Sequence, residues 1–407
     1  MPNPKSEFLW TSGHELSSAE HVVFLGLFNA DRYQAKIVNW LSRLDLSNTH
    51  LVIGNNHSSD NSLAWISTLA KTLRNPVTIT GNDRNYGGYG NLAVNLHHFP
   101  EAKWITTLHQ DDVYHSKHVQ SHRALLEASN SRLGMVCSEA RSILPDGRVV
   151  PFPRANWLLS KDVDPVTVFL ANLKNHTYPF SGATFARRVI DGFPIPWHST
   201  AFPDTEIVMK MCFEFDVMFA SGITVDYLEN PDSESHSLSK EHRDFGAYQA
   251  LTRVFAHPNY RAICETVEEN QYQMFIEALM EGIAQRIQNE ELSSLLRQSV
   301  LEITAEYLGT FPMLASELAK GYARIGDKGA ISILEALGAN ISPGDEVDNA
   351  QEIKTPITPA RTKINPILRR AFGLLPMRVR RILFRMVMKT KFAQTRLKAW
   401  DFDWTKQ

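Results

Sequence analysis

The chain has 407 residues, of which 43% are hydrophobic and 21% charged, and these values exclude a disordered or fibrous protein. This length exceeds the needs of one small core and predicts two or three domains. The three cysteines are scattered without a Cys-x-x-Cys pair, so neither a disulfide framework nor a thiolate zinc site is indicated. The polar N-terminus and the absence of an apolar run of about 18 residues favour a cytoplasmic protein without a membrane span.

Charge is distributed unevenly along the chain. Residues 361–398 hold 12 of the 42 basic residues and no acid, so the rest carries 30 basic residues against 44 acidic ones. We therefore expect a basic arm attached to an acidic body. Aliphatic residues interleave with the basic ones, a pattern typical of a helix that lies on an anionic membrane surface. Nucleic acid is a less favoured partner because aromatic stacking groups are few, and a helix packing on a neighbouring subunit remains an alternative.

Short apolar runs alternate with helical patterns in the first half of the chain. Strands are expected at residues 21–28, 50–54, 76–80, 104–108 and 133–137. Residues 33–44 and 62–73 between them have the apolar spacing of helices. This alternation predicts βαβ units and a mostly parallel α/β sheet. Because ligands of such sheets bind beyond the carboxyl ends of the strands, the polar residues after each strand are the first candidates for a site.

The end of the fourth expected strand carries the most informative motif, His109-Gln110-Asp111-Asp112. Two adjacent carboxylates can hold a hard divalent cation such as Mg²⁺ together with phosphate oxygens. Such a cation would neutralise the charge that builds on a departing diphosphate. The alternative is a solvated acidic turn that caps a helix starting near His115.

Two further segments suggest ligand chemistry. Residues 85–91 contain Gly87, Gly88 and Gly90, and glycines let the backbone approach a ligand closely, although a plain Gly-rich turn has the same composition. Asp204 opens an apolar helical run that we expect to reach Phe219. Its carboxylate would be either a helix cap or a general base that takes a proton from an acceptor hydroxyl.

Three histidines share a helical spacing. His115, His118 and His122 could lie on one helix face. A zinc site needs about three or four ligands, and no cysteine or acid completes this set, so we interpret the histidines as a polar helix face.

The second half of the chain predicts a different organisation. Residues 264–337 have helical apolar spacing, and their apolar stripe predicts a core or a subunit contact, which leaves a homo-oligomer open. Prolines among polar residues predict a linker between about 340 and 366. The expected layout is an α/β domain at 1–260, a helical region at 261–340, a linker at 341–366 and a basic amphipathic helical tail at 367–407.

The order of these elements resembles the family-two glycosyltransferases of the GT-A fold, especially bacterial rhamnosyl- and galactofuranosyltransferase-like members. The resemblance covers residues 20–240. The matching elements are Asn29, the run 55–62, the Asn-x-Gly-Gly-x-Gly element 85–90, the segment 108–112, Ser181-Gly182, the segment 203–207 and His236. Their common order and spacing favour the resemblance over chance matches of single motifs.

The resemblance implies an inverting, metal-dependent glycosyltransferase on a Rossmann-like GT-A domain. The donor would be a UDP-, dTDP- or GDP-linked sugar, and the acceptor a carbohydrate or lipid-linked saccharide in bacterial surface polysaccharide synthesis. In this family pattern, Asn29 and Asn55 would contact the nucleotide base, and Asn85, Gly87 and Gly88 would line the donor pocket.

The same resemblance implies the residues that hold the metal and move the proton. Asp111 would bind the donor through Mg²⁺ or Mn²⁺, with Asp112 beside it and His236 as a further ligand. Asp204 would be the catalytic base. The basic tail would bring the enzyme to the inner face of the cell membrane, where a lipid-linked acceptor lies.

Three positions depart from the family pattern. Asn55 and His109 stand where the family has Asp, and Pro203 stands where it has Glu. Asn55 exchanges a carboxylate acceptor for an amide that also donates, and His109 removes a negative charge. These departures leave a non-catalytic sugar-nucleotide-binding or scaffold subunit as an alternative. A sugar nucleotidyltransferase is a weaker alternative, because the segment after the first strand lacks a basic phosphate-binding loop.

Overall fold

The computed structural model describes residues 5–12, 16–129, 131–152, 165–174, 180–193, 203–212, 214–229, 238–268 and 271–308. All of these residues belong to one compact unit, Pro4–Glu346. His236, the expected linker and the basic tail lie outside the described residues. Among the described helices, none combines the length and the apolar character that a membrane span requires.

A mixed β-sheet forms the centre of this unit. Its strands are β1 (Ser6–Thr11), β2 (His21–Leu27), β3 (His50–Asn55), β4 (Val77–Asn82), β5 (Trp104–His109), β6 (Val113–Tyr114), β7 (Leu133–Ile143), β8 (Val149–Pro151), β9 (Thr184–Ala186) and β10 (Asp216–Leu228). Their order is β1-β4-β3-β2-β5-β9-β7-β10-β6, with β8 paired to β7. Strands β4, β3, β2 and β5 are mutually parallel, as is the pair β7–β10, whereas β1, β6, β8 and β9 pair antiparallel.

Helices follow most of the parallel strands, as the alternation of patterns predicts. They are α1 (Gln34–Leu41), α2 (Ser62–Ala70), α3 (Gly87–Asn95), α4 (His118–Glu127), α5 (Pro165–Lys174), α6 (Arg187–Gly192), α7 (Pro203–Met211), α9 (Lys240–Phe255), α10 (Pro258–Thr266), α11 (Tyr272–Arg286) and α12 (Glu290–Leu308). The α/β class and the five expected strands are therefore confirmed, and the described part of the expected helical region, up to Leu308, is helical.

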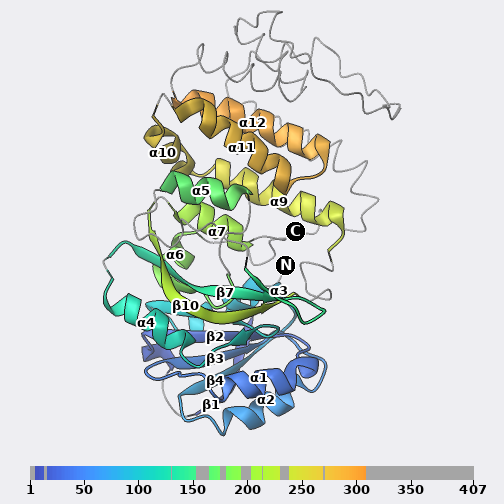
Figure 1. Cartoon of the computed structure of the whole chain (residues 1–407). Coiled ribbons are helices and arrows are strands. Elements are labelled where there is room, and N and C mark those ends of the chain that lie inside the picture. Colours follow the sequence, from blue (N-terminus) through green and yellow to red (C-terminus); the bar gives the residue numbers. More distant parts are fainter. Residues whose placement is uncertain are drawn as a thin grey trace, which may run out of the picture. The chain divides into compact units, whose positions relative to one another are not determined.

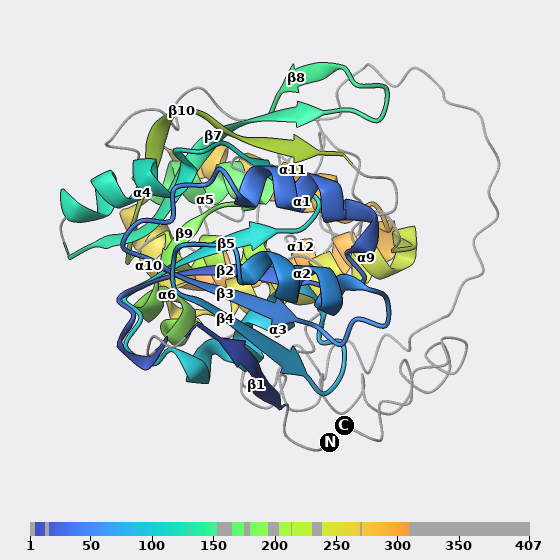
Figure 2. The same cartoon turned by 90° about the horizontal axis from the view of Figure 1, so that it is seen from below.

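Strand order reverses at the middle of the parallel series. The chain starts this series at β2, places β3 and β4 on one side of it, and returns to place β5 on the other side (Figure 2). In doubly wound sheets, ligands bind outside the carboxyl ends of the strands at such a switch point. The segments that leave β2 and β5 carry Asn29 and Asp111, so the topology brings these two residues to the switch point.

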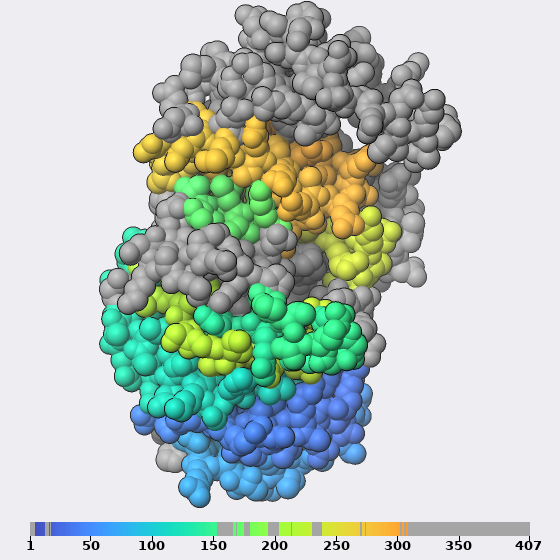
Figure 3. Space-filling model, in the orientation of Figure 1, coloured from blue at the N-terminus to red at the C-terminus, as the bar shows by residue number. Residues whose placement is uncertain are grey.

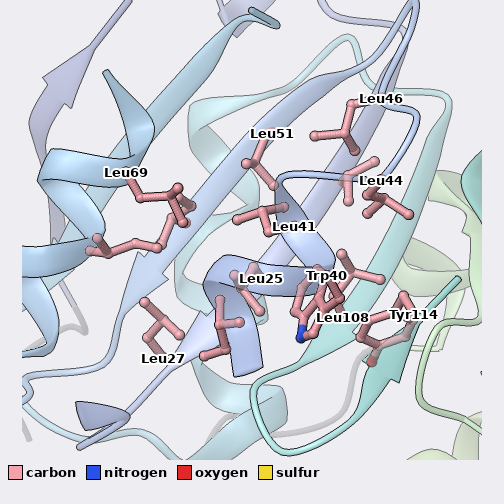
Figure 4. Close-up of a cluster of buried hydrophobic side chains, with 14 of the residues drawn as sticks. Leu25, Leu27, Trp40, Leu41, Leu44, Leu46, Leu51, Leu69, Leu108 and Tyr114 are labelled. Carbon is pink, nitrogen blue, oxygen red and sulfur yellow. The ribbon is translucent and has the colours of Figure 1, made fainter. Parts of the chain in front are cut away.

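Both faces of the parallel strands are covered, which explains their continuous apolar runs. Helices α1 and α2 pack on one face through a leucine-rich cluster (Figure 4), and α3, α6 and α7 contribute to a second cluster on the strands. Within the first cluster, Trp40 packs edge-on against Tyr114, with ring centroids 4.9 Å apart. This contact joins the hydrophobic core to β6, the strand that directly follows the acidic motif in the sequence.

Helix α7 is buried over most of its length because it is packed on two sides (Figure 1). Its Ile207 and Val208 belong to the cluster on the sheet. Its Met209, with Cys212 just beyond the helix, belongs to the cluster formed with α5 and α9–α12. Figure 3 shows α5 against the orange surface of α11 and α12, which form the outer part of this helical cluster.

The expectation that the helical run from Asp204 reaches Phe219 is wrong. Helix α7 ends at Met211, and Val217, Met218 and Phe219 pair in parallel with β7. Pairing with a strand that would otherwise be a sheet edge overrides the local helical spacing, because β-structure depends more on neighbouring strands than on intrinsic preference.

The interpretation of the α4 histidines as a polar helix face is also wrong. His118 and His122 are fully buried against the sheet, and α4 begins only at His118, after His115. His118 Nε2 donates to the Gly182 carbonyl at 3.0 Å, and its Nδ1 lies 2.8 Å from the Thr224 hydroxyl. The hydrogen-bonding nitrogens of these rings are thus satisfied inside the protein, whereas the sequence pattern predicts that they face solvent.

His122 belongs to a chain of polar side chains that crosses the sheet. Its Nδ1 lies 2.7 Å from the Thr184 hydroxyl, which is 2.6 Å from that of Thr106, and Thr106 is 2.9 Å from His21 Nε2. Burial lowers the pKa of His21 to about 4 and that of His122 well below its usual range. The fold therefore requires neutral imidazoles in its core.

These buried histidines predict acid-dependent loss of stability. Burial lowers the pKa of His21 and His118 from 6.5 to about 4, so between these values the unfolded chain binds protons that the folded chain does not. The free energy of unfolding should therefore fall as pH falls from 6.5, by up to about 1.4 kcal/mol per pH unit for each histidine. Thermal unfolding followed from pH 7.5 to pH 5 measures this slope.

A substitution in the same core provides the comparison. The His118→Gln variant should be less stable than wild type at pH 7.5 but should lose less stability on acidification. Replacement of the exposed His57 by Gln should leave the slope unchanged. Equal slopes in wild type and His118→Gln would show that His118 does not cause the acid sensitivity.

Candidate functional site

A side-chain bridge joins the loops that leave β2 and β5. The Phe28 amide donates to Gln110 Oε1 at 2.8 Å, and Gln110 Nε2 donates to the Phe28 carbonyl at 2.9 Å. These two bonds continue the pairing of β2 and β5 by one more step. The next residue on the β2 side, Asn29, then turns with φ +46°. The loops at the switch point are therefore fixed relative to each other by the bonds between the Gln110 side chain and the Phe28 backbone.

His109, Asp111 and Asp112 form an acidic cluster at the end of β5. One ligand atom from each of the three lies within 4.8 Å of the other two. Asp112 is buried, and its Oδ1 accepts a hydrogen bond from the Leu228 amide at 2.9 Å. Its Oδ2 is also buried and has no hydrogen bond of normal geometry to a described residue. Burial and the adjacent Asp111 charge raise the pKa of Asp112 to about 7, although the nearby Ser181 hydroxyl acts to lower it.

This donor set fits a divalent cation. Buried polar atoms are normally satisfied, so the unpartnered Asp112 oxygen beside a second carboxylate needs a partner. Carboxylate oxygens suit Mg²⁺ and Mn²⁺, and an imidazole nitrogen is compatible with Mn²⁺. The third predicted ligand, His236, is outside the described residues and is not placed by the structure.

Tyr114 holds the backbone of the acidic cluster through its hydroxyl. Its hydroxyl accepts a hydrogen bond from the His109 amide at 2.7 Å and lies 2.5 Å from the Ser181 hydroxyl. The next residue, Gly182, has φ +81°, and a Cβ there would come within 2.8 Å of the His118 ring. The Ser181-Gly182 element of the sequence thus places the Ser181 hydroxyl against Tyr114, which binds the backbone of the cluster. Only glycine fits at position 182, next to the His118 ring.

Tyr227 on β10 is influenced by the charges of both the cluster and Asp204. The pKa of Tyr227 is raised to about 12, first by burial and then by the charges of Asp112, Asp111, Asp204 and Glu229. Asp204 is half-buried in the first turn of α7. Tyr227 therefore lies within electrostatic range of all three predicted functional carboxylates, two at the end of β5 and one on α7.

The loop after β3 holds the loop after β2. The Ser59 amide donates to Asn29 Oδ1 at 2.9 Å, and the Asn29 amide donates to the Ser58 hydroxyl at 3.1 Å. The Ser58 amide in turn donates to Asn55 Oδ1 at 3.3 Å. Both predicted base-binding asparagines thus use their side-chain oxygens within the loops. A ligand contact from either side chain would come from its Nδ2 group.

A buried amide network fixes the Gly-rich segment. Asn56 Oδ1 accepts from the Tyr86 amide at 3.0 Å and from Asn82 Nδ2 at 2.9 Å. Asn56 Nδ2 donates to Asn85 Oδ1 at 2.6 Å, and that oxygen also accepts from the Gly87 amide at 2.9 Å. Asn85 therefore holds the turn that starts α3, where Gly87 has φ +73°. Gly88, in the next position, is exposed and leaves its backbone accessible.

Lys36 on α1 is a residue of this region that no sequence motif marks. Its Nζ lies 3.4 Å from the Asp111 carbonyl oxygen. Burial lowers the pKa of Lys36, whereas the charges of Asp111 and Asp112 raise it. A half-buried ammonium group therefore stands beside the acidic pair. Its place follows from the packing of α1 beneath the β5–β6 turn, which sequence spacing does not reveal.

Comparisons with known proteins give fold-level likenesses. No protein-family model and no curated protein matches the chain. Residues 1–349 of S. aureus TarS in complex with UDP-GlcNAc are 14% identical, with 78% of this chain and 90% of that chain covered and a TM-score of 0.46. The mannosyltransferase PcManGT from Pyrobaculum calidifontis in complex with GDP-Man and Mn2+ is 14% identical, with coverages of 78% and 84% and a TM-score of 0.43. Likenesses of this degree do not define what this chain binds.

Proposed function

We propose that this protein is a glycosyltransferase that uses Mg²⁺ or Mn²⁺ to transfer a sugar from a nucleoside diphosphate sugar to a carbohydrate or glycolipid acceptor. The observation that carries the proposal is the cluster of His109, Asp111 and Asp112, with its unpartnered buried oxygen, at the switch point between β2 and β5. A nucleotide bound across this edge would place its phosphates beside the acidic pair.

The donor side of the site combines fixed backbone with charge. The loops of Asn29 and Asn55 form the nucleoside side, and the backbone at Gly87 and Gly88 borders the donor. When bound between Asp111 and Asp112, the divalent cation would neutralise the charge that develops on the departing diphosphate. Lys36 adds a second positive charge at the same place.

The acceptor side depends on Asp204. Its carboxylate would take the proton of the acceptor hydroxyl while that oxygen forms a bond to the anomeric carbon of the sugar. The bond between this carbon and the diphosphate oxygen breaks in the same displacement, so the configuration inverts. The charges of Asp204 and of the acidic pair both raise the pKa of Tyr227, which supports placing the three carboxylates near one another.

A non-catalytic nucleotide-sugar-binding subunit is the second candidate. It is favoured by His109, which supplies a nitrogen where the family has a carboxylate, and by Asn55, whose oxygen is used within its own loop. This candidate keeps the binding site and loses only turnover, so binding and turnover have to be measured separately.

We further propose a role in bacterial surface polysaccharide synthesis, since the basic tail favours a lipid-linked acceptor.

Binding is tested by thermal unfolding with UDP, dTDP and GDP, each with Mg²⁺, with Mn²⁺ and with EDTA. A ligand that binds only the folded state adds about 2.7 kcal/mol of stability at 100 times its Kd. At least one nucleoside diphosphate should raise the melting temperature with a metal and not with EDTA. If millimolar concentrations of all three have no effect with either metal, the site does not bind nucleotide and the proposal fails.

The basic tail carries a separate proposal that rests on sequence alone. We expect it to bind anionic membranes, because its basic residues and interleaved aliphatic residues act together, and the binding should weaken with salt. Replacement of Arg378, Arg380, Arg381 and Arg385 by Glu should release the protein from anionic vesicles, as should truncation before Pro366. Equal flotation of full-length and truncated proteins would mean that the tail is not the anchor, and would favour a subunit contact instead.

A further inference from the structure

A buried ion cluster lies two residues beyond Asp204. Glu206 is fully buried, and Arg253 donates to both of its oxygens, through Nε at 3.0 and 2.9 Å and through one terminal nitrogen at 2.7 Å. Lys210, one helical turn away and also buried, forms an ion pair with the same carboxylate. A single carboxylate thus meets two cations, one from its own helix and one from another.

The cluster joins the helix of Asp204 to the helical region. Glu206 and Lys210 belong to α7, whereas Arg253 comes from the last turn of α9. Asn259 on α10 adds a hydrogen bond from its Nδ2 to the Lys210 carbonyl at 2.8 Å. Helix α7 is therefore held by polar bonds to both α9 and α10, in addition to its apolar contacts.

The energetics of such a cluster favour a role in orientation over one in stability. Desolvation of buried charges offsets most of their attraction, and well-packed apolar groups of similar size are often as stable. A forked guanidinium that binds both carboxylate oxygens instead fixes a direction. Burial raises the pKa of Tyr89 in the Gly-rich helix α3, and the Glu206 charge raises it further, so the cluster lies within electrostatic range of that helix.

Helix geometry transmits this orientation to Asp204. Residues two positions apart on an α-helix are separated by about 200°, so they lie on nearly opposite faces. Glu206 points into the ion cluster, and Asp204 is half-exposed on the other side of the same turn. Fixing the Glu206 side chain therefore fixes the rotation of the first turn of α7.

We propose that Arg253, acting through Glu206 with Lys210, is a positioning residue that sets Asp204 against the acidic pair at the end of β5. The helical region then takes part in the reaction without touching the substrate. This inference rests on the proposed function, in which Asp204 is the base.

The experiment compares three full-length variants in the presence of Mn²⁺ and a nucleotide sugar that wild type turns over. Arg253→Met removes the fork and the charge, and Arg253→Lys keeps the charge alone. Arg261→Met is the matched control, because Arg261 forms an exposed ion pair with Glu265 in the same helical region. The melting temperature of each variant is measured first. Nucleotide Kd, kcat and acceptor KM are then measured well below the lowest of these melting temperatures.

A positioning role predicts a selective loss of kcat. Displacement of a catalytic group by about 1 Å can cost about 100-fold, so kcat of Arg253→Met should fall about 10- to 100-fold while the nucleotide Kd changes less than about twofold. Arg253→Lys should recover part of this loss, and Arg261→Met should match wild type. If Arg253→Met does not fold, the loss of kcat in folded Arg253→Lys carries the test.

Two results would overturn the inference in distinguishable ways. Wild-type kcat in folded Arg253→Met or Arg253→Lys, with only a lower melting temperature, would show a purely structural cluster and leave the proposed function intact. Wild-type turnover in Asp204→Asn, measured in parallel, would remove the base on which both the inference and the proposed mechanism depend.

Discussion

An Asp111→Asn variant is expected to lose about 1,000-fold or more of its transfer rate, together with metal-dependent nucleotide binding. Asparagine has the same shape but cannot supply the negative charge that holds a divalent cation beside Asp112. Asp111 is only half-buried, so the fold should be retained. Removal of its charge should also lower the pKa of Asp112, because Asp111 is one of the groups that raise it.

The assay of this variant combines transfer rates with nucleotide binding at several Mn²⁺ concentrations. Asp146→Asn is a suitable control, since Asp146 is an exposed carboxylate in the turn between β7 and β8 and pairs locally with Arg148. It should behave like wild type. Full activity of the wild-type enzyme in EDTA would contradict the metal site, whatever Asp111→Asn does.

Replacement of Asp204 by Asn should reduce turnover about 100- to 10,000-fold, the usual contribution of a general base. Nucleotide affinity should stay near the wild-type value, because Asp204 lies on α7 and the acidic pair follows β5. The measurement is kcat with donor and acceptor both saturating, beside nucleotide Kd from calorimetry.

Glu229 provides the sharpest comparison for Asp204. Both carboxylates raise the pKa of Tyr227, so both lie within electrostatic range of the same phenol. If Asp204 is the base, Glu229→Gln should retain most of the wild-type turnover. Loss of turnover in Glu229→Gln together with normal turnover in Asp204→Asn would transfer the role of base to Glu229.

The parallel part of the fold could be predicted from sequence because its strands are buried on both faces. Such strands read as unbroken apolar runs, and the polar residues after them mark the carboxyl edge of the sheet. The positions of His109, Asp111 and Asp112 followed directly from this reasoning. Strand β10 could not be recognised, since it pairs with β7, more than 70 residues earlier, and this partner is invisible to local spacing.

The prediction for the buried histidines was wrong for a related reason. The spacing of His118 and His122 is the same whether their face meets solvent or a sheet, and the hydroxyls of Thr184, Ser138 and Thr224 that satisfy them come from three different strands. Sequence spacing therefore identified the face but not its environment.

Residues that reach the site from other elements were missed for lack of any motif. Lys36 comes from α1, Tyr227 from β10 and Arg253 from α9, and each is identified only by its surroundings in the folded chain. Conversely, Asn85 was expected to line the donor pocket, and its oxygen is occupied by Asn56 and the Gly87 amide. Its proposed contact with the donor remains a prediction.

Release of nucleoside diphosphate from UDP-, dTDP- and GDP-linked sugars, with Mn²⁺ and with EDTA, tests the central claim most directly. The account predicts that wild type releases the diphosphate from at least one donor with Mn²⁺. It further predicts that acceptor saccharides accelerate this release, and that EDTA or the Asp111→Asn substitution stops it. Metal-dependent nucleotide binding without release from any donor, with or without acceptors, would contradict a transferase and establish the non-catalytic binding subunit.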